Sequence, residues 1–171
     1  MPYTMVQGIV TPGDGEVGLI VNGLPAQRNG NTFFVNAVPL LEGENTLTVA
    51  ATSADGSTLF DSIAVYVDTS QTEEWISLEL IPQTGVAPFN TTLYAKLNLL
   101  ERSVVSSNLT YDGPGSIVIT EVSPDEYDLD IADPGLYTLA YQATNNLGSI
   151  FQQNIMVYVY DRTELSNFVA R

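Results

Sequence analysis

Alternation of apolar and polar residues with a period of two recurs along the chain, and it constrains the fold more than any other feature. Because successive side chains of a strand point to opposite faces of a sheet, such alternation predicts strands with one buried face. Turns rich in Gly, Pro, Asn and Asp separate these stretches, and a helical period is rare. Short strands with turns about every 8 to 12 residues are typical of a β-sandwich or a β-barrel.

The polar residues 68–74 have no apolar period and predict a linker between two sets of strands. We expect strands before it at residues 6–11, 16–21, 32–35, 46–51 and 59–67, and after it at 75–81, 91–99, 108–111, 116–122, 126–131, 137–144 and 150–160. Each set fits one sandwich of roughly immunoglobulin size. The expected fold class is all-β, with two tandem immunoglobulin-like β-sandwiches at residues 1–69 and 76–161 and a linker at 70–75.

Residues 162–171 follow as a tail or as the start of a further segment. Leu165, Phe168 and Val169 have helical spacing there. Both a short amphipathic turn and a frayed tail stay open as interpretations.

The chain carries a net charge of −15, from 20 acids against five bases. The bases are scattered along the sequence: Arg28, Lys96, Arg102, Arg162 and Arg171. Because phosphate neutralisation drives nucleic-acid binding and an anionic membrane surface repels an acidic protein, we expect neither partner. No apolar run approaches the about 20 residues of a membrane helix, so we expect no membrane insertion.

Cysteine and histidine are both absent. The chain therefore has no disulfide, no thiolate or imidazole ligand for zinc, and no Cys–His or Ser–His nucleophile pair. Glycoside hydrolysis by paired carboxylates needs a cleft, and two small sandwiches do not suggest one. We expect no enzyme and no resident cofactor, and calcium binding by the acidic side chains stays open.

Short motifs cover nearly all of residues 5–68: VNG at 21–23, TF at 32–33, VPL at 38–40, EGENTLTVAA at 42–51, Gly56 and VYVD at 65–68. This pattern resembles a bacterial immunoglobulin-like repeat, the kind found beside glucodextranase-type catalytic domains and in large surface proteins. Asn22-Gly23 suits a type I′ hairpin, in which both turn residues have positive φ. We expect residues 42–45 to cross between the sheets and Leu47, Val49 and Ala51 to face the core.

The second half contains GVAPF at 85–89, a strand at 91–97, DPGLYTL at 133–139 and a turn at 145–148. These segments resemble a PKD-type immunoglobulin-like domain over about residues 76–160. The family's Trp-Asp-Phe-Gly-Asp-Gly stretch is missing, and Tyr111–Gly115 stands near its position. After the Asp-Pro-Gly turn, Tyr137 resembles the tyrosine of a tyrosine corner, whose ring joins the core and whose hydroxyl bonds back to the turn. We expect an architectural role for Tyr137.

The acidic stretch that begins at Asp125 alternates acids with apolar residues that are expected to point inward: Tyr127, Leu129 and Ile131. Hard cations bind several oxygen ligands, so one interpretation of this stretch is a calcium site, although it lacks the spacing of an EF-hand loop. The candidate ligands are Asp125, Asp128, Asp130 and Asp133. The alternative is a solvated face on an edge strand that opposes aggregation. The linker acids Asp68, Glu73 and Glu74 pose the same choice between calcium and a polar hinge.

Four aromatic residues are candidates for sugar contacts or for ordinary packing: Trp75, Tyr111, Tyr158 and Tyr160. Asn90 and Asn108 match the N-glycosylation pattern. The two resemblances imply a non-catalytic structural or interaction module, a spacer or an adhesion segment, of a larger bacterial protein that is secreted or lies at the cell surface. Its implied partners are other domains of that protein, or cell-surface proteins and glycans. The alternative is a carbohydrate-binding accessory to a polysaccharide-degrading enzyme.

Overall fold

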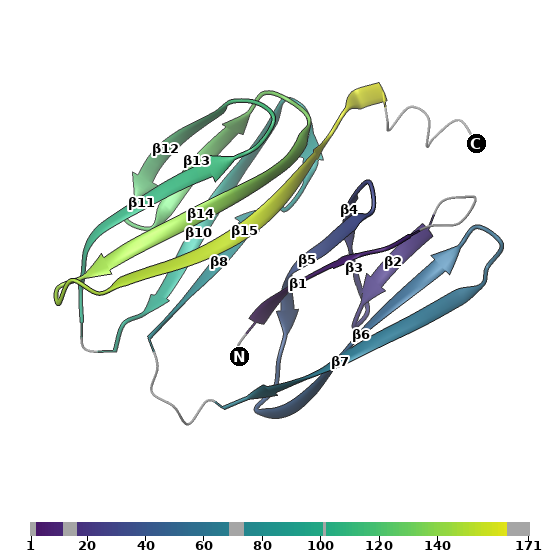
Figure 1. Ribbon diagram of the computed structural model, residues 1–171. Helices are drawn as coiled ribbons and strands as arrows, with labels where there is room; N and C mark the ends of the chain where they lie inside the picture. The colour runs from purple at the N-terminus through teal and green to yellow at the C-terminus, as the bar shows by residue number, and fades with distance from the viewer. Residues whose placement is uncertain (1–2, 12–16, 69–73, 101, 164–171) are drawn as a thin grey trace. The chain divides into compact units, whose positions relative to one another are not determined.

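The chain is all-β and forms two β-sandwiches, as the alternation predicts. The computed structural model describes residues 3–11, 17–68, 74–100 and 102–163 (Figure 1). The chain divides into two compact units, Met1–Gln71 and Thr72–Arg171. Among the described residues, no helix has the length and apolarity needed to cross a membrane. The expectations for Leu165, Phe168, Val169 and Glu73 fall outside the described residues.

Seven strands build the first sandwich: β1 (Tyr3–Ile9), β2 (Val17–Val21), β3 (Leu24–Pro25), β4 (Gln27–Asn29), β5 (Thr32–Pro39), β6 (Gly43–Ser53) and β7 (Thr58–Val67). They form two sheets, in the order β1-β5-β4 and β3-β2-β6-β7. The core between the sheets consists of Leu19, Val21, Phe33, Val35, Val38, Leu40 and Leu47. Val49 and Ala51 pack against this core, which confirms the face expected for β6.

The β2–β3 turn and the β5–β6 crossing are held by asparagine side chains. Asn22 and Gly23 have φ values of 46° and 84°, as a type I′ turn requires. The backbone N–H of Thr48 donates to Asn22 Oδ1 at 2.8 Å and so ties this turn to β6. At the crossing, Asn45 Nδ2 donates to the carbonyl of Leu41 at 2.7 Å, and Leu41 N–H donates to Asn45 Oδ1 at 2.8 Å.

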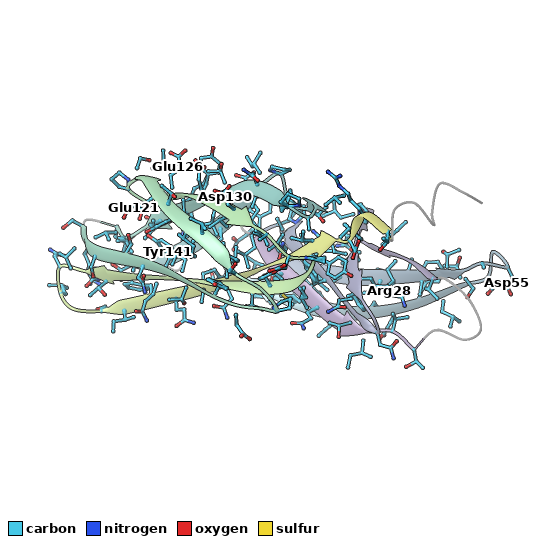
Figure 2. The ribbon with its side chains drawn as sticks, turned by 90° about the horizontal axis from the view of Figure 1, so that it is seen from above. Arg28, Asp55, Glu121, Glu126, Asp130 and Tyr141 are labelled. Carbon is cyan, nitrogen blue, oxygen red and sulfur yellow. The ribbon has the colours of Figure 1, made fainter. Side chains whose placement is uncertain are left out.

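The chain enters and leaves the first sandwich at the same end. Tyr3 pairs with Pro39 at the start of β1, and Val67 pairs with Gly43 at the end of β7. Because Pro39 and Gly43 flank one crossing, both chain ends of this unit lie beside it. The turn between β6 and β7, with Asp55 at its tip, lies at the opposite end (Figure 2).

Eight strands build the second sandwich: β8 (Trp75–Ile81), β9 (Gly85–Val86), β10 (Phe89–Asn98), β11 (Val104–Asp112), β12 (Ile117–Ser123), β13 (Glu126–Ile131), β14 (Gly135–Asn145) and β15 (Ile150–Tyr160). The sheet orders are β12-β13-β10-β8 and β11-β14-β15-β9. In chain order these correspond to strands ABED and CFG of the immunoglobulin fold, with β9 added beside the last strand. The second sandwich therefore has immunoglobulin-like topology.

The core of the second sandwich is larger than that of the first and is rich in tyrosine. Tyr127, Tyr137 and Tyr141 are all buried in it, together with leucine, isoleucine and valine from both sheets. The alternation of β14 places Tyr137, Leu139 and Tyr141 on the core face, as expected. The strands β3, β4 and β9, of two or three residues each, were not expected, because so short a segment has no detectable alternation.

Candidate functional site

Tyr137 forms a tyrosine corner between β13 and β14. Its ring is fully buried, and its hydroxyl donates to the carbonyl of Asp133 at 2.8 Å. The loop between β11 and β12 packs against it closely, because a Cβ on Gly113 would lie 2.2 Å from Tyr137 Cδ1. Burial, and then the negative charge of Asp133, raise the pKa of Tyr137. The buried ring and the hydroxyl bond back to the turn are the geometry of a tyrosine corner.

A second tyrosine bond joins the two sheets near the β12–β13 turn. The hydroxyl of Tyr141, from β14, donates to Asp125 Oδ1. Asp125 has a φ of 65° in this turn, and its carbonyl accepts the N–H of Ala95 at 2.8 Å. Burial, and then the hydrogen bond to Asp125 and its charge, raise the pKa of Tyr141.

Tyr127 extends this contact into a small polar network. Its hydroxyl lies 3.1 Å from Ser107 Oγ on the opposite sheet, and its ring meets Tyr141 edge-on at a centroid distance of 6.2 Å. Burial also raises the pKa of Tyr127. General acid or base work at neutral pH needs a pKa near the working pH. Phenols whose pKa values are raised above about 10 stay protonated at neutral pH. These hydroxyls are therefore suited to hydrogen bonds that join the two sheets.

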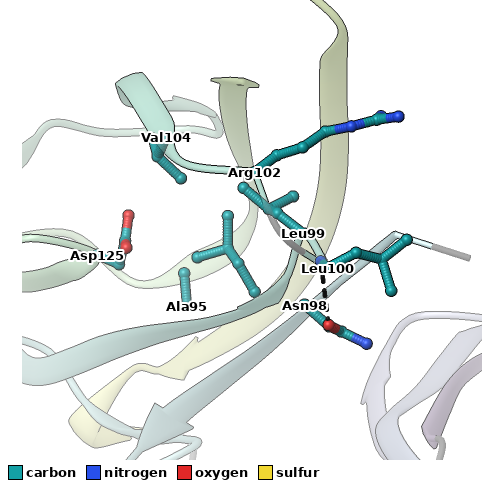
Figure 3. Close-up of a pocket in the computed structure, with 8 residues that line it drawn as sticks. Ala95, Asn98, Leu99, Leu100, Arg102, Val104 and Asp125 are labelled. Atoms are coloured by element: carbon teal, nitrogen blue, oxygen red, sulfur yellow. Dashed lines mark hydrogen bonds between the residues drawn. The ribbon is translucent and has the colours of Figure 1, made fainter. Parts of the chain in front are cut away.

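A shallow pocket of about 350 Å3 lies beside Asp125 (Figure 3). Its wall consists of Ala95, Leu97, Asn98, Leu99, Leu100, Arg102, Val104 and Asp125. Both charged side chains of the wall already have partners: Asp125 accepts the bond from Tyr141, and Arg102 lies 3.1 Å from Glu74 Oε2. Neither charged group of the wall is therefore left unpaired to orient a small ligand.

The four expected calcium ligands do not meet at one point. Asp125 precedes β13 and Asp133 follows it, and a strand from Glu126 to Ile131 is about 17 Å long. Asp128 and Asp130 are exposed between them on the outer face of β13. Among the residues that the structure describes, no three His, Cys, Asp or Glu side chains are grouped so that they could hold a metal ion.

The prediction that this acidic strand lies at a sheet edge is wrong. β13 lies between β12 and β10, so both of its edges are hydrogen-bonded. Its acids are separated by neutral neighbours: Asp128 pairs with Thr92 and Thr120, and Thr92 Oγ1 donates to Asp128 Oδ1 at 2.8 Å. Figure 2 shows Glu126 and Asp130 on the outer side of the sheet. The acids form a solvated face in the interior of a sheet.

The two linker acids that the structure describes, Asp68 and Glu74, have different surroundings. Glu74 forms the ion pair with Arg102, and its other carboxylate oxygen is buried without a hydrogen-bond partner in the structure. Asp68 is exposed at the end of the first sandwich. Nothing in the local sequence signals the pairing of Glu74 with Arg102, because the two residues lie 28 positions apart.

The candidate sugar-binding aromatics do not share one surface. Trp75 begins β8 and pairs with Asn98, whereas Tyr111 lies near the end of β11 on the other sheet. Tyr158 and Tyr160 are half-buried, with ring centroids 4.8 Å apart and planes at 88°. Asn90 and Asn108, in the two glycosylation motifs, are both exposed.

Sequence reasoning also missed a buried asparagine at the end of β14. Asn145 is fully buried, and its Oδ1 accepts the N–H groups of Leu147 and Ser149, each at 3.0 Å. The turn at residues 145–148 was expected, but the sequence gives no sign that its first residue, Asn145, is buried. Its burial follows from the close approach of Ser103, whose carbonyl accepts the N–H of Asn146 at 3.0 Å.

No protein-family model and no curated protein sequence matches the chain. Solved structures similar to it include fibronectin(III)-like modules of CbhA from Clostridium thermocellum, at 11% identity and a TM-score of 0.38, covering 94% of this chain and 88% of that one. The D00-D0 domain of intimin has 11% identity and a TM-score of 0.38, with 92% and 85% covered. SGBP-B of Bacteroides ovatus, solved with a mixed-linkage heptasaccharide, has 15% identity and a TM-score of 0.29, with 92% and 41% covered. These likenesses are too low to bear on function.

Proposed function

We propose that the chain is a non-catalytic spacer and interaction segment of a larger bacterial protein that is secreted or lies at the cell surface. One observation carries the proposal: the chain enters and leaves the second sandwich at opposite ends. Trp75, at the start of β8, pairs with Asn98 at one end. Tyr160, at the end of β15, pairs with Val86, close to where β10 begins at the other end. A unit built this way transmits tension along its length.

The last strand of this sandwich is joined to the short strand β9 in a geometry that resists such tension. β9 runs parallel to β15, with Gly85 opposite Val159 and Val86 opposite Tyr160. The N–H of Ala87 donates to the carbonyl of Tyr160 at 2.9 Å. Thr84 Oγ1 donates to the carbonyl of Tyr158 at 2.6 Å. Pulling the two chain ends apart loads these bonds together in shear, whereas a strand peeled from its end loses its bonds one by one.

The first sandwich supports the interaction part of the proposal. Its two chain ends lie at one end of the fold, so the β6–β7 turn projects away from both. Such a unit presents its far end to other molecules. The bacterial immunoglobulin-like and PKD-like resemblances, and the acidic surface, support the placement outside the cell.

Single-molecule stretching of the whole chain, with handles near Tyr3 and Arg162, tests the proposal. The first sandwich is pulled from one end and should open first, at the lower force, releasing at most about 230 Å of chain. The second is loaded in shear and should open later, releasing at most about 300 Å. A second sandwich that opens first, or two openings at equal force, would contradict the proposal that this unit carries tension.

The carbohydrate-binding accessory is the second candidate, and the half-exposed ring of Trp75 favours it. A pull-down on insoluble cellulose and β-glucan, with Trp75→Ala as the control, separates the two. The spacer proposal expects no retention on either polymer. Retention that Trp75→Ala abolishes would support sugar binding instead. Turnover of chromogenic glycosides, lost on changing a specific carboxylate pair, would contradict the non-catalytic part of the proposal.

A further inference from the structure

The last strand of the first sandwich is a long and unprotected sheet edge. β7 has ten residues and pairs, among the described residues, with β6 alone. Its first seven residues, Thr58–Ala64, are all exposed, so neither face of this part is covered by the other sheet. Long exposed edges are ready to pair with another strand.

The register identifies which backbone groups of β7 face outward. Ser62 N–H donates to Asp61 Oδ1 at 2.8 Å, so it is not directed at β6. In an antiparallel pair the residues bond alternately to the partner strand and to the outside. The outward groups are therefore those of Thr58, Phe60, Ser62, Ala64 and Tyr66. The odd-numbered residues bond to β6.

Apolar side chains flank these groups on both faces of the strand. Leu59 and Ile63 lie on the core-facing side, opposite Ala51 and Leu47 of β6, yet are 78% and 62% exposed. Phe60 and Tyr66 lie on the outer side and are 70% and 74% exposed. The last strand of the second sandwich differs, because its exposed middle consists of Gln152, Gln153 and Asn154. The apolar edge is thus a property of the first sandwich.

We propose that β7 pairs antiparallel with β7 of a second copy of this chain, with Ile63 on the two-fold axis. In this register Phe60 of each copy lies opposite Tyr66 of the other, and Asp61 lies opposite Val65. The outward groups of Phe60, Ser62, Ala64 and Tyr66 then bond to one another across the axis. This interaction surface goes beyond the spacer function and does not depend on it.

The strand is more complementary to itself in this register than in the adjacent one. Moving the axis to Ser62 places Asp61 opposite Ile63 and separates the aromatic residues. In the Ile63 register the Phe60–Tyr66 pair instead forms twice, once on each side of the axis. Such aromatic cross-strand pairs stabilise a sheet. The four large side chains expose on the order of 500 Å2 per chain, so two copies bury at most about 1,000 Å2, the size of a weak specific interface.

Charge sets the conditions under which the pairing occurs. Two copies each with a net charge of −15 repel one another. The repulsion is screened as the Debye length falls from about 10 Å at 0.1 M salt to about 3 Å at 1 M. Added salt therefore strengthens the pairing. β7 itself carries one charge, Asp61.

Cysteine cross-linking tests the register, because the chain has no cysteine of its own. In the Ile63→Cys variant the two thiols lie opposite each other, with Cα atoms about 4.5 Å apart, within disulfide range. In the matched Leu59→Cys variant, on the same face of the same strand, they lie about 26 Å apart. Under oxidising conditions we expect a covalent dimer from Ile63→Cys at least about tenfold faster than from Leu59→Cys, since proximity governs the rate. Equal rates, or no dimer from Ile63→Cys, would overturn the proposal.

Sedimentation of the unmodified chain at up to several hundred micromolar, in low and high salt, gives the second measurement. Ile63→Lys removes one unit of net negative charge but places two lysines on the axis. We expect this variant to stay monomeric where the parent chain dimerises. Ile9→Lys makes the same charge change at the edge strand β1, at a position even more exposed than Ile63, and should dimerise like the parent. An Ile63→Lys chain that dimerises, or an unmodified chain that stays monomeric at high salt, contradicts the pairing through β7.

Discussion

Two tyrosines of β14, four residues apart on one face, hold opposite ends of the second sandwich. Tyr137 bonds to a backbone carbonyl at the β13–β14 corner, and Tyr141 bonds to a carboxylate at the β12–β13 turn. The Asp-Pro-Gly turn before Tyr137 made its role predictable. The partner of Tyr141 was not predictable, because Asp125 lies 16 positions away and on the other sheet. Local sequence patterns carry no information on such contacts.

Removing the hydroxyl at the corner should destabilise the second sandwich. Tyr137→Phe keeps the buried ring and loses one hydrogen bond, so we expect a loss of about 1 kcal/mol in the free energy of unfolding. Urea unfolding followed by the fluorescence of Trp75, the single tryptophan, measures the change. Tyr111→Phe, at a partly exposed position on the same sheet, should change the free energy little. Equal losses in the two variants would contradict a specific corner bond.

Asp61 limits pairing at the apolar edge, because its carboxylate accepts the outward N–H of Ser62. Asp61→Val frees that N–H and adds a residue that favours strands. We expect the variant to associate at least about tenfold more strongly than the parent chain. One hydrogen bond gained between the copies and one negative charge removed from each account for an increase of that size. Asp130→Asn, with the same change in net charge on the other sandwich, is the control. Similar association of the two variants in sedimentation would assign the effect to net charge alone.

At the scale of elements, the loop between β11 and β12 fits tightly over the tyrosine corner. Gly113 and Gly115 leave no room for a side chain against Tyr137 and Asp133. This segment therefore closes one end of the sandwich. Its contacts depend on the long-range register of β11 with β14, so the sequence alone predicted a turn there and no more.

Gly113→Ala should destabilise the second sandwich by about 1–3 kcal/mol, because its Cβ meets the buried Tyr137 ring. Gly18→Ala is the matched control, since its Cβ would have only an ordinary contact of 3.9 Å with a backbone oxygen. We expect little change from the control. Differential scanning calorimetry of both variants checks the difference. Full tolerance of Gly113→Ala would contradict the close packing of this loop.

The sequence predicts where strands occur better than it predicts which strands lie side by side in a sheet. The expected strands at 75–81, 126–131 and 150–160 have the observed bounds. The order of strands in a sheet is set by crossings between layers, which local patterns do not report. The expected edge position of β13 was wrong for that reason, and the apolar edge of β7 was not foreseen.

At the scale of the whole molecule, the two sandwiches differ in how they respond to alkali. Burial raises the pKa values of Tyr127, Tyr137 and Tyr141, all in the second sandwich. The unfolded chain releases these phenol protons near pH 10, whereas the folded unit retains them. Stability is therefore fully present below about pH 10 and is lost as the pH rises further.

Urea unfolding of the second sandwich between pH 8 and pH 11, followed by Trp75 fluorescence, measures this loss. We expect the free energy of unfolding to stay level up to about pH 10 and then to fall. Tyr141→Phe, with one buried phenol fewer, should show a shallower fall. Constant stability up to pH 11, or an unchanged slope in the variant, would contradict the burial of these hydroxyls.

The central claim is that the second sandwich bears load along the line from Trp75 to Tyr160. Stretching it through cysteines introduced at two pairs of positions tests this most directly. Trp75 with Arg162 loads β9 and β15 in shear, whereas Trp75 with Asn146 pulls from one end and peels β8 from β10. We predict a markedly higher unfolding force for the first pair. Equal forces for the two pairs would contradict the claim, since the parallel contact of β9 with β15 would then carry no load.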